Sequence, residues 1–597
     1  SLGGATRLCR VLLATLTVLA VTHAPPQSTA QATVGTTVSP EPAPSAVAQA
    51  PDQWRDRGLE ALRRGAFGEA ALAFETAGRL YDEAGDVAQR CASLLLAGQA
   101  EQFAGQHRSA VANLDQALTL AREAGDTRRT AAALAALGNV RLAMGDLEAA
   151  SQLLKEARDL ARERGHPEVA VAALNDLGNL QVAQGDTAAA LLSYGDAASL
   201  AETAGDPQAA AQARVNAASA AYRAGRYPEA FALLQQAEES LGAGPDTYLK
   251  AHALINSGVL YSDLRAFLPQ EGDTLLGRAH AALTGALTVA ERLGDQRALS
   301  YACGYLGGLY EDVGQYPEAL DLTRRAVFAA QQQGASEALY RWHWQTGRLL
   351  ARLGDRDRAI AAYRLSMADL QAIREEMSSC YANPESSYQK TASAVCLELV
   401  DLLLQRASHL REGETPEPYL AEARDTLELL KVFELREYFQ DDCLDVGRLA
   451  QKKLDVVSEK AAVFYPILLP DRVELLVSFA GRLKRFTLPV GVDELTRETR
   501  EFRRKLVKRT TWEFLPHAQK LYDWLIRPLE GELAALDPDT LVFVPDGALR
   551  TVPMAALHDG RGFLVERYAI AVTPSLSLTD PHPLQREHAR VLSLGLT

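Results

Sequence analysis

The sequence has 597 residues, of which 47% are hydrophobic and 23% charged, and its formal net charge is -14. This length predicts two or more domains, because a single hydrophobic core stops growing at roughly 250–300 residues. The acidic balance argues against nucleic acid or an anionic membrane as a partner, since both favour a basic surface. The basic run Arg503-Arg504-Lys505 lies beside Glu501, and we interpret it as the solvated face of a helix.

The six cysteines are too dispersed for a disulfide framework. None forms a CxxC pair or has a histidine at metal-ligand spacing, so no metal site is predicted. Cys91 and Cys303 fall within helical repeats and are expected to be buried. The sequence has no GxxxxGK[ST] phosphate loop, which argues against a nucleotide-binding regulator. We therefore expect no cofactor.

Residues 1–32 have the layout of a secretory signal peptide. Two arginines precede an apolar run over residues 11–21, and Ala30-Gln31-Ala32 offers a cleavage signal. The run is short for a membrane span, so we predict export to the periplasm or the extracellular space and no stable span. An uncleaved anchor or chance hydrophobicity are the alternatives. Residues 33–50 are rich in Pro, Ser, Thr, Ala and Gln and are expected to form a linker.

Residues 51–375 contain a repeat with a period of 40 residues. Three glycine series carry this period, and each separates or lies within segments of helical periodicity. We expect each unit to be a helix A, a tight turn at a glycine, a helix B and a Gly-Asp break. A small residue within helix A lets helix B pack closely. The series are Gly65, Gly105, Gly145, Gly185 and Gly225; Gly85, Gly125, Gly165 and Gly205; and Gly98, Gly138, Gly178 and Gly258.

These units resemble tetratricopeptide repeats (TPR) of longer period than the usual one of about 34 residues. The resemblance rests on motifs such as Leu137-Gly138-Asn139, Tyr227-Pro228-Glu229-Ala230 and Tyr316-Pro317-Glu318-Ala319. It implies about eight units stacked into a superhelical solenoid whose concave surface binds a protein or peptide. The period is interrupted between Tyr261 and Asp273, where a loop is expected.

Asparagines on the A helices are the candidate partner-binding residues of the concave surface. Asn175 and Asn179 are four residues apart and share one helix face. The alternative is that these side chains cap or bridge neighbouring helices. The candidates are Asn139, Asn175, Asn179, Asn216 and Asn256.

Residues 376–462 keep a helical pattern without the 40-residue period, and we interpret them as a helical connector. After Ala462 the pattern changes to short apolar strands and then alternates between helices and strands, which predicts an α/β domain. The expected strands cover residues 463–469, 473–479, 483–488, 541–544 and 568–572, the last two being buried. The expected helices cover residues 492–509 and 513–535.

Residues 463–597 resemble the N-terminal part of the CHAT domain, a caspase-like cysteine peptidase family that often follows TPR arrays. The resemblance rests on Pro545-Asp546-Gly547 and on the segments Tyr522–Leu529, Leu549–Pro553, Phe563–Glu566 and Pro574-Ser575-Leu576. It implies a multidomain fold in which an all-α solenoid precedes a partial α/β caspase-like domain. The chain lacks an initial Met and ends in an apolar run, which suggests a fragment.

The catalytic residues of that family are not found in this sequence. The family uses a cysteine thiolate and a histidine that transfers its proton. The histidine precedes Gly and the cysteine follows Ser-Ala, but no histidine or cysteine here has those neighbours. No catalytic residue is therefore assigned, and His558 is interpreted as a turn residue. We expect the catalytic pair to lie beyond this chain.

Two functions are compatible with these observations. In the first, the array recruits a protein or peptide partner and the CHAT domain is part of a cysteine endopeptidase. In the second, the protein is a non-catalytic interaction scaffold with an inactive CHAT remnant. The sequence does not indicate the oligomeric state.

Overall fold

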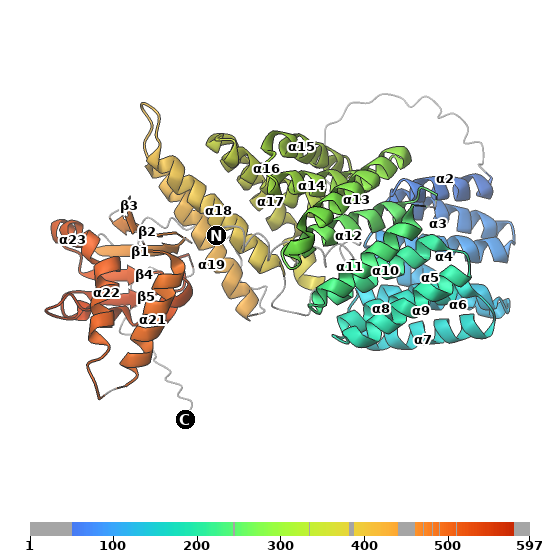
Figure 1. The fold of residues 1–597 in the computed structure, drawn as a ribbon, viewed down its shortest axis with the longest axis horizontal. Coiled ribbons are helices and arrows are strands. Elements are labelled where there is room, and N and C mark those ends of the chain that lie inside the picture. The colour runs from blue at the N-terminus through green and yellow to red at the C-terminus, as the bar shows by residue number, and fades with distance from the viewer. Residues whose placement is uncertain are drawn as a thin grey trace, which may run out of the picture. The chain divides into compact units, whose positions relative to one another are not determined.

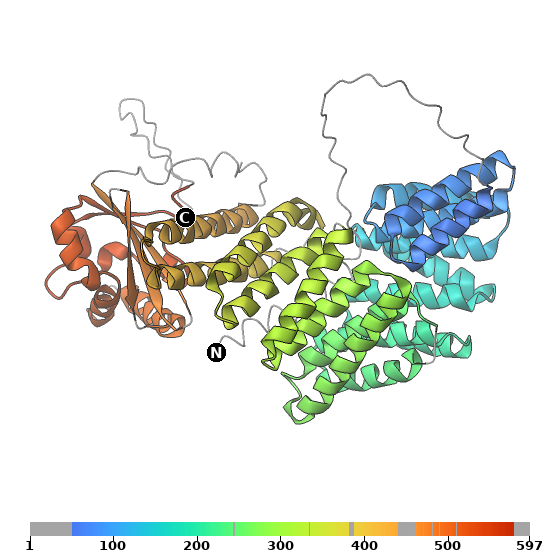
Figure 2. The ribbon, with the colours of Figure 1, turned by 90° about the horizontal axis from the view of Figure 1, so that it is seen from above.

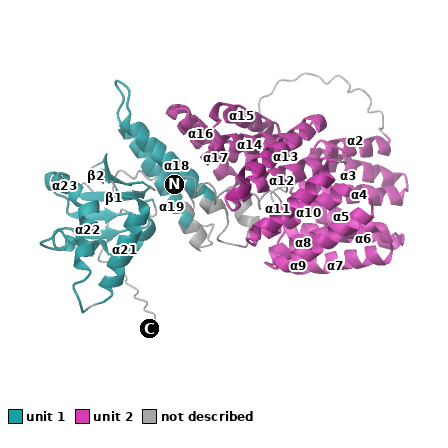
Figure 3. Ribbon diagram, in the orientation of Figure 1, with its two compact units in different colours: residues 1–4, 388–597 teal, residues 5–387 magenta. Residues whose placement is uncertain are grey.

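A computed structural model of the chain describes residues 50–242, 245–333, 335–380, 387–439, 460–469, 471–479, 481–488, 490–508 and 510–577. The predicted signal peptide, almost all of the predicted linker and the final apolar run at residues 591–596 lie outside these ranges. The chain divides into two compact units, one ending at Ser387 and the other beginning at Tyr388 (Figure 3). Each unit is described separately below.

Within the described residues, the first unit is an array of sixteen helices in eight antiparallel A–B pairs (Figures 1 and 2), as the 40-residue period predicts. The predicted loop after Tyr261 is present as a short 3-10 turn, η1 (Pro269–Glu271). The A helices are α2 (Pro51–Arg63), α4 (Val87–Phe103), α6 (Thr127–Ala143), α8 (Pro167–Ala183), α10 (Pro207–Arg223), α12 (Tyr248–Leu264), α14 (Gln296–Asp312) and α16 (Ser336–Arg352). The B helices are α3 (Phe67–Glu83), α5 (His107–Glu123), α7 (Leu147–Glu163), α9 (Thr187–Thr203), α11 (Tyr227–Leu241), α13 (Gly272–Leu293), α15 (Tyr316–Gln333) and α17 (Arg356–Cys380).

In each Gly-Asp pair the glycine ends one helix and the aspartate begins the next. The glycine has a positive φ, such as 67° at Gly125, a conformation that ends a helix without a Cβ clash. The aspartate that follows is the N-cap of the next helix, and the Asp126 carboxylate accepts a hydrogen bond of 2.9 Å from the Arg129 amide. Asp86, Asp146, Asp186, Asp206 and Asp295 cap helices in the same way.

Glycines inside the A helices set the distance between the two helices of a repeat. A Cβ atom placed on Gly138 would lie 2.6 Å from Cγ of Leu154 on helix B. Gly98 faces Leu114 and Gly178 faces Tyr194 in the same way. The predicted role of these small residues is therefore confirmed. Cys91 and Cys303 are buried among the packed helices, also as predicted.

The first repeat contacts the sixth and seventh, so the array closes on itself. The Phe67 ring stacks on Phe103 at a centroid distance of 5.0 Å, and both rings meet Tyr248 edge-on, at 5.9 and 5.7 Å. The backbone of Gly65 lies against the Asp295 carboxylate, because a Cβ there would be 2.8 Å from its Oδ1 atom. The contacts of Tyr248 and Asp295 join residues that are 145 to 230 positions apart, whereas a repeat pattern predicts contacts between neighbouring repeats only.

The second unit is a five-stranded mixed sheet with helices on both faces. The strand order is β3-β2-β1-β4-β5, in which β1, β2 and β3 are antiparallel and β1, β4 and β5 are parallel. The strands are β1 (Ala461–Leu468), β2 (Val473–Phe479), β3 (Arg482–Leu488), β4 (Thr540–Phe543) and β5 (Ala569–Val572). The helices are α18 (Ser387–Ser408), α19 (Glu417–Phe439), α21 (Val492–Leu506), α22 (Leu515–Leu525) and α23 (Glu530–Leu536), with 3-10 turns η2 (Arg527–Leu529), η3 (Gly547–Thr551), η4 (Met554–Ala556) and η5 (Leu564–Glu566).

Both faces of the central strand β1 are buried, which explains the two helical layers. On one face, Phe464 packs with Phe502 of α21 and Leu521 of α22 in a single apolar core. On the other face, buried Glu474 of β2 binds two arginines, one of which donates 2.6 Å to the backbone oxygen of Leu404 on α18. The predicted connector helices α18 and α19 thus form the second helical layer of this unit.

Two details of the predicted α/β domain are wrong. The strand predicted at residues 568–572 is present as β5 but is not buried, and Val572 is 55% exposed, because β5 is an edge strand within the described residues. The single helix predicted at residues 513–535 is divided into α22, η2 and α23. Pro528 lies at the division, where its missing N–H interrupts helical bonding.

The glycine contact gives a direct test of repeat packing. Gly138→Ala should lower the local free energy of unfolding by about 1–2 kcal/mol, because overpacking costs about 1–3 kcal/mol and alanine regains about 1 kcal/mol of helix propensity. The control is Gly195→Ala on α9, where a Cβ would meet nothing within 4 Å, and this change should be neutral or stabilising. Hydrogen exchange of the two helix pairs measures both effects. Equal effects at the two positions would contradict the packing argument.

Candidate functional site

The A helices form the inner side of the solenoid. Each A helix from α4 to α14 packs against the A helix of the next repeat, whereas only weaker contacts join successive B helices within the described residues. Helices that crowd on one side and separate on the other produce a curved stack, with the crowded layer inside the curve. Side chains that project from the A helices away from the B helices therefore share one continuous surface, which we call the inner surface.

A row of hydrogen-bonded amide side chains crosses the inner surface from α4 to α10. Asn139 of α6 is hydrogen bonded to Gln102 of α4. Asn216 of α10 donates a hydrogen bond of 2.9 Å to the Oδ1 atom of Asn175 on α8, and Gln212 donates 3.1 Å to Asn216. We call this row the amide ladder. Each hydrogen bond of the ladder joins one repeat to the next or lies within a single A helix.

Asp176 lies at the centre of the amide ladder. Burial raises the pKa of its carboxyl group to about 6, and the side-chain amides of Asn139, Asn179 and Asn175 partly offset this effect. Asn179 donates a hydrogen bond of 3.3 Å to Asp176 and accepts one of 2.8 Å from the hydroxyl group of Tyr194. The ladder thus surrounds a carboxyl group that is ionised at neutral pH and protonates in mildly acidic solution.

The structure brings four of the five predicted partner-binding residues together. Asn139, Asn175 and Asn179 surround Asp176, and Asn216 extends the row by one repeat. Asn256 on α12 is half-buried and forms no side-chain hydrogen bond within the described residues. Bridging between neighbouring helices, the alternative role left open by the sequence, is seen for these four asparagines, whereas contact with a ligand stays a prediction. Sequence reasoning missed Asp176 and Gln102, although Asp176 adjoins Asn175 directly.

The second candidate region is the edge of the sheet where the parallel strands end. The chain leaves β1 toward β2 on one side and leaves β4 toward β5 on the other, so these adjacent strands form a topological switch point. In open α/β sheets, ligand sites lie outside the carboxyl ends of the strands at such a point. Leu468, Pro545-Asp546-Gly547 and Thr573–Ser577 occupy this edge, which we call the carboxyl edge.

Matches to two sequence families support the division of the chain into a helical array and an α/β unit. Residues 89–163 match a tetratricopeptide repeat family, and residues 515–596 match the CHAT domain. The chain contains TPR repeats and a C-terminal CHAT domain. The matched CHAT segment includes α22, α23, β4 and β5, and the strands β1–β3 and helix α21 precede it. The predicted fold, a TPR solenoid followed by a mixed α/β sheet, is confirmed.

Several solved structures of helical repeat proteins are similar to the TPR array. Yeast Tom70 is 13% identical, with 63% of this chain and 69% of that chain covered and a TM-score of 0.41. BtubC from P. vanneervenii is 21% identical, with 38% and 91% covered and a TM-score of 0.32. The Rap conjugation gene regulator of plasmid pLS20, in complex with the Phr* peptide, is 17% identical, with 49% and 80% covered and a TM-score of 0.35. A comparison with curated proteins gives no match.

Helix α19 holds two loops of the CHAT carboxyl edge through buried polar side chains. The Glu428 carboxylate accepts hydrogen bonds from the Ser575 hydroxyl group at 2.5 Å and from the amides of Leu576 and Ser577, each at 3.1 Å. Glu428 is only 3% exposed, so these three hydrogen bonds take the place of those that its carboxylate would form with water. The loop after β5 is therefore fixed by a helix that lies nearly 150 residues earlier in the sequence.

The loop after β4 is fixed by a second buried residue of the same helix. The Lys431 ammonium lies 2.5 Å from Oδ1 of Asp546, and Arg550 lies 2.9 Å from the same oxygen. Although burial opposes ionisation of Asp546, Lys431 and Arg550 hold the pKa of its carboxyl group below its usual value. Arg550 also pairs with Glu434 of α19. Residues 428, 431 and 434 lie on one face of the helix.

The structure describes the side chains of three cysteines, Cys91, Cys303 and Cys396, and all three are buried. Burial raises the pKa of the Cys303 thiol to about 11 and that of Cys396 to about 12, which disfavours the reactive thiolate. His558 is buried, and its Nδ1 atom accepts a hydrogen bond of 2.9 Å from the Gly560 amide, so the predicted turn role is confirmed. No group of three or more His, Cys, Asp or Glu residues is placed to hold a metal within the described ranges. Likewise, none of the described helices has the length and apolar composition needed to cross a membrane.

The buried ion pair at Lys431 should contribute more to stability than an exposed pair of the same length. Lys431→Ala should lower the stability of the CHAT unit by roughly 3 kcal/mol, because it leaves a largely buried carboxylate without its main cation. The control is Lys484→Ala, which removes an ion pair of 2.5 Å to Glu532 between side chains that are 52% and 40% exposed. This change should cost less than about 1 kcal/mol. Thermal unfolding measures both, and equal losses would contradict the assignment.

Proposed function

We propose that the TPR array binds a protein or peptide partner on its inner surface, and that the CHAT domain is the supporting part of a caspase-like cysteine endopeptidase. The proposal that the array binds a partner rests on the amide ladder. Each amide side chain has donors and an acceptor, which is also the hydrogen-bonding pattern of a peptide backbone. A row of such groups across successive repeats can therefore bind an extended chain.

Asp176 adds an electrostatic preference to this proposed site. Its carboxylate is ionised above a pKa of about 6, so a partner with a basic or amide-rich segment complements the ladder at neutral pH. The net charge of -14 makes the same preference plausible for the first encounter, since opposite charge speeds association. The bound segment would compete for amide groups that now bond to each other, so binding exchanges hydrogen bonds.

Contact between the array and its partner can be measured with peptides selected from a displayed random library against the full chain. The double variant Asn175→Ala/Asn216→Ala removes both members of one ladder bond, together with the acceptor of Gln212 and one amide that bonds to Asp176. We expect it to weaken peptide binding by about tenfold, since each lost hydrogen bond is worth about 0.5–1.5 kcal/mol. The control is Gln152→Ala/Gln236→Ala, which changes exposed residues of helices α7 and α11. Equal weakening by both variants would contradict the proposal.

The peptidase half of the proposal rests on the CHAT match and on the parallel strands that end at the carboxyl edge. A cysteine peptidase needs a thiolate and a histidine placed together, and parallel strands deliver such residues to one edge. Helix α19, which follows the array in sequence, holds two loops of that edge. Coupling between binding and cleavage requires a partner that binds one arrangement of these elements better than another.

The reading frame beyond Thr597 tests the peptidase half. We expect a histidine followed by Gly and, further on, a cysteine preceded by Ser-Ala. If both are present, changing that cysteine to Ala should abolish peptide cleavage and leave peptide binding by the array unchanged. A reading frame without both motifs would contradict the peptidase and favour the second candidate, a non-catalytic interaction scaffold. Export, predicted from residues 1–32, is part of the proposal for either function.

A further inference from the structure

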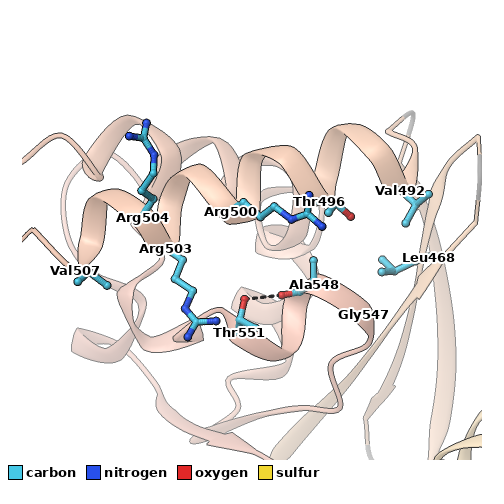
Figure 4. Close-up of a pocket in the computed structure, with 10 residues that line it drawn as sticks. All are labelled: Leu468, Val492, Thr496, Arg500, Arg503, Arg504, Val507, Gly547, Ala548 and Thr551. Carbon is cyan, nitrogen blue, oxygen red and sulfur yellow. Dashed lines mark hydrogen bonds between the residues drawn. The ribbon is translucent and has the colours of Figure 1, made fainter. Parts of the chain in front are cut away.

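The carboxyl edge of the CHAT sheet contains a pocket of about 670 Å³ between helix α21 and the turn η3 (Figure 4). Leu468, at the end of β1, and Gly547 and Ala548, just after β4, form its floor. The pocket therefore lies at the point where the strand order reverses, which is the usual position of a ligand site in an open α/β sheet.

Arginines of α21 line this pocket. Figure 4 shows Arg503 directed from α21 toward Thr551 and Arg500 lying along the same opening, while Arg504 points away. Arg504 pairs with Glu501 at 2.5 Å. Neither Arg500 nor Arg503 has a carboxylate partner within the described residues. From the sequence, the basic run Arg503-Arg504-Lys505 is interpreted as a solvated helix face. In the structure, part of this run lies over a pocket.

Three of the four carboxylates of α21 are paired with other side chains, and the fourth, that of Asp493, is exposed to solvent. Glu498 bonds to His517 of α22 at 2.5 Å and to Lys520 at 3.0 Å. Glu494 lies 3.6 Å from the same Lys520. The two sides of α21 therefore differ in charge, with carboxylates paired toward α22 and free guanidinium groups toward the pocket. A free guanidinium presents a planar set of donors that matches a carboxylate.

The rest of the lining combines apolar side chains with the hydroxyl groups of Thr496 and Thr551. Leu468, Val492 and Val507 surround the arginines, and Val507 is 72% exposed. Phosphate sites commonly add free backbone amides, but the Gly547 amide already donates a hydrogen bond of 2.8 Å to Asp546. None of the described lining residues is aromatic, so these residues offer no stacking surface for a nucleobase.

We propose that this pocket binds an acidic segment of a polypeptide, with a glutamate or aspartate side chain between Arg500 and Arg503 and a neighbouring apolar side chain against Leu468 and Val492. Charge complementarity and the apolar floor together select this ligand class. The site needs neither the amide ladder nor a catalytic cysteine, so it stands if the proposed partner binding or peptidase activity fails.

The full chain can be tested by fluorescence anisotropy with a labelled peptide that contains two glutamates flanked by leucines. The variant Arg500→Gln/Arg503→Gln should weaken binding by about tenfold or more, because two charge-assisted contacts are lost. The control is Arg497→Gln, an exposed arginine of the same helix outside the pocket, which should change binding by less than about twofold. Each variant preserves helix-forming residues, and thermal unfolding verifies that it folds.

Two further probes identify the ligand class. Replacing the glutamates of the peptide with glutamine should reduce binding as strongly as the double arginine variant. Replacing the leucines with serine should also reduce it, because the apolar floor is then unfilled. The proposal is overturned if Arg497→Gln weakens binding as much as the double variant. It is also overturned if inorganic phosphate displaces the peptide at concentrations near the Kd of the peptide.

Discussion

Close approach of two helices at a glycine, repeated every 40 residues, is the constraint on which the array depends. Because Gly98, Gly138 and Gly178 lack a Cβ atom, the B helix of each repeat packs tightly on the A helix. The A helices then pack on one another along one side of the array, while the B helices separate. This geometry creates an inner surface, and it places residues from successive repeats next to each other at intervals of about 40 positions, as in the bond between Asn175 and Asn216.

A second constraint governs the CHAT unit, where the central strand is buried on both faces. The helices after the array satisfy that constraint by packing on the sheet. Helix α19 also contributes Glu428 and Lys431, which hold the loops after β5 and β4. Buried charges are costly without partners, so these bonds favour a single arrangement of the loops. The loops at the carboxyl edge are therefore positioned by a helix that comes between the array and the sheet in sequence.

Periodicity predicts most of this architecture, because repeats and strands leave regular signals in sequence. The glycine period predicted eight helix pairs, and the apolar runs predicted five strands in the described part of the sheet. Contacts between distant segments leave no such signal. The closure at Phe67, Phe103 and Tyr248 depends on the curvature of the stack. The bond from Lys431 to Asp546 depends on the second helical layer of the sheet, to which α19 belongs.

In the candidate sites, too, the residues that recur periodically were predicted and the others were missed. The asparagines of the ladder were predicted because they recur on A helices at similar positions, but Asp176 was missed because it occurs in a single repeat. The role of Arg500 and Arg503 was also missed, since a basic run on a helix ordinarily faces solvent. The pairing of Glu494 and Glu498 of α21 with His517 and Lys520 of α22 shows which side of α21 retains free charge.

The central claim is that the partner lies on the inner surface of the TPR array. Site-specific photo-crosslinking tests it directly, with a benzophenone amino acid placed either at Gln212, at the α10 end of the amide ladder, or at Gln152 on the outer helix α7. The account predicts that a bound peptide is crosslinked from position 212 and not from position 152. Crosslinking from position 152 alone would place the partner on the outer surface and contradict the account.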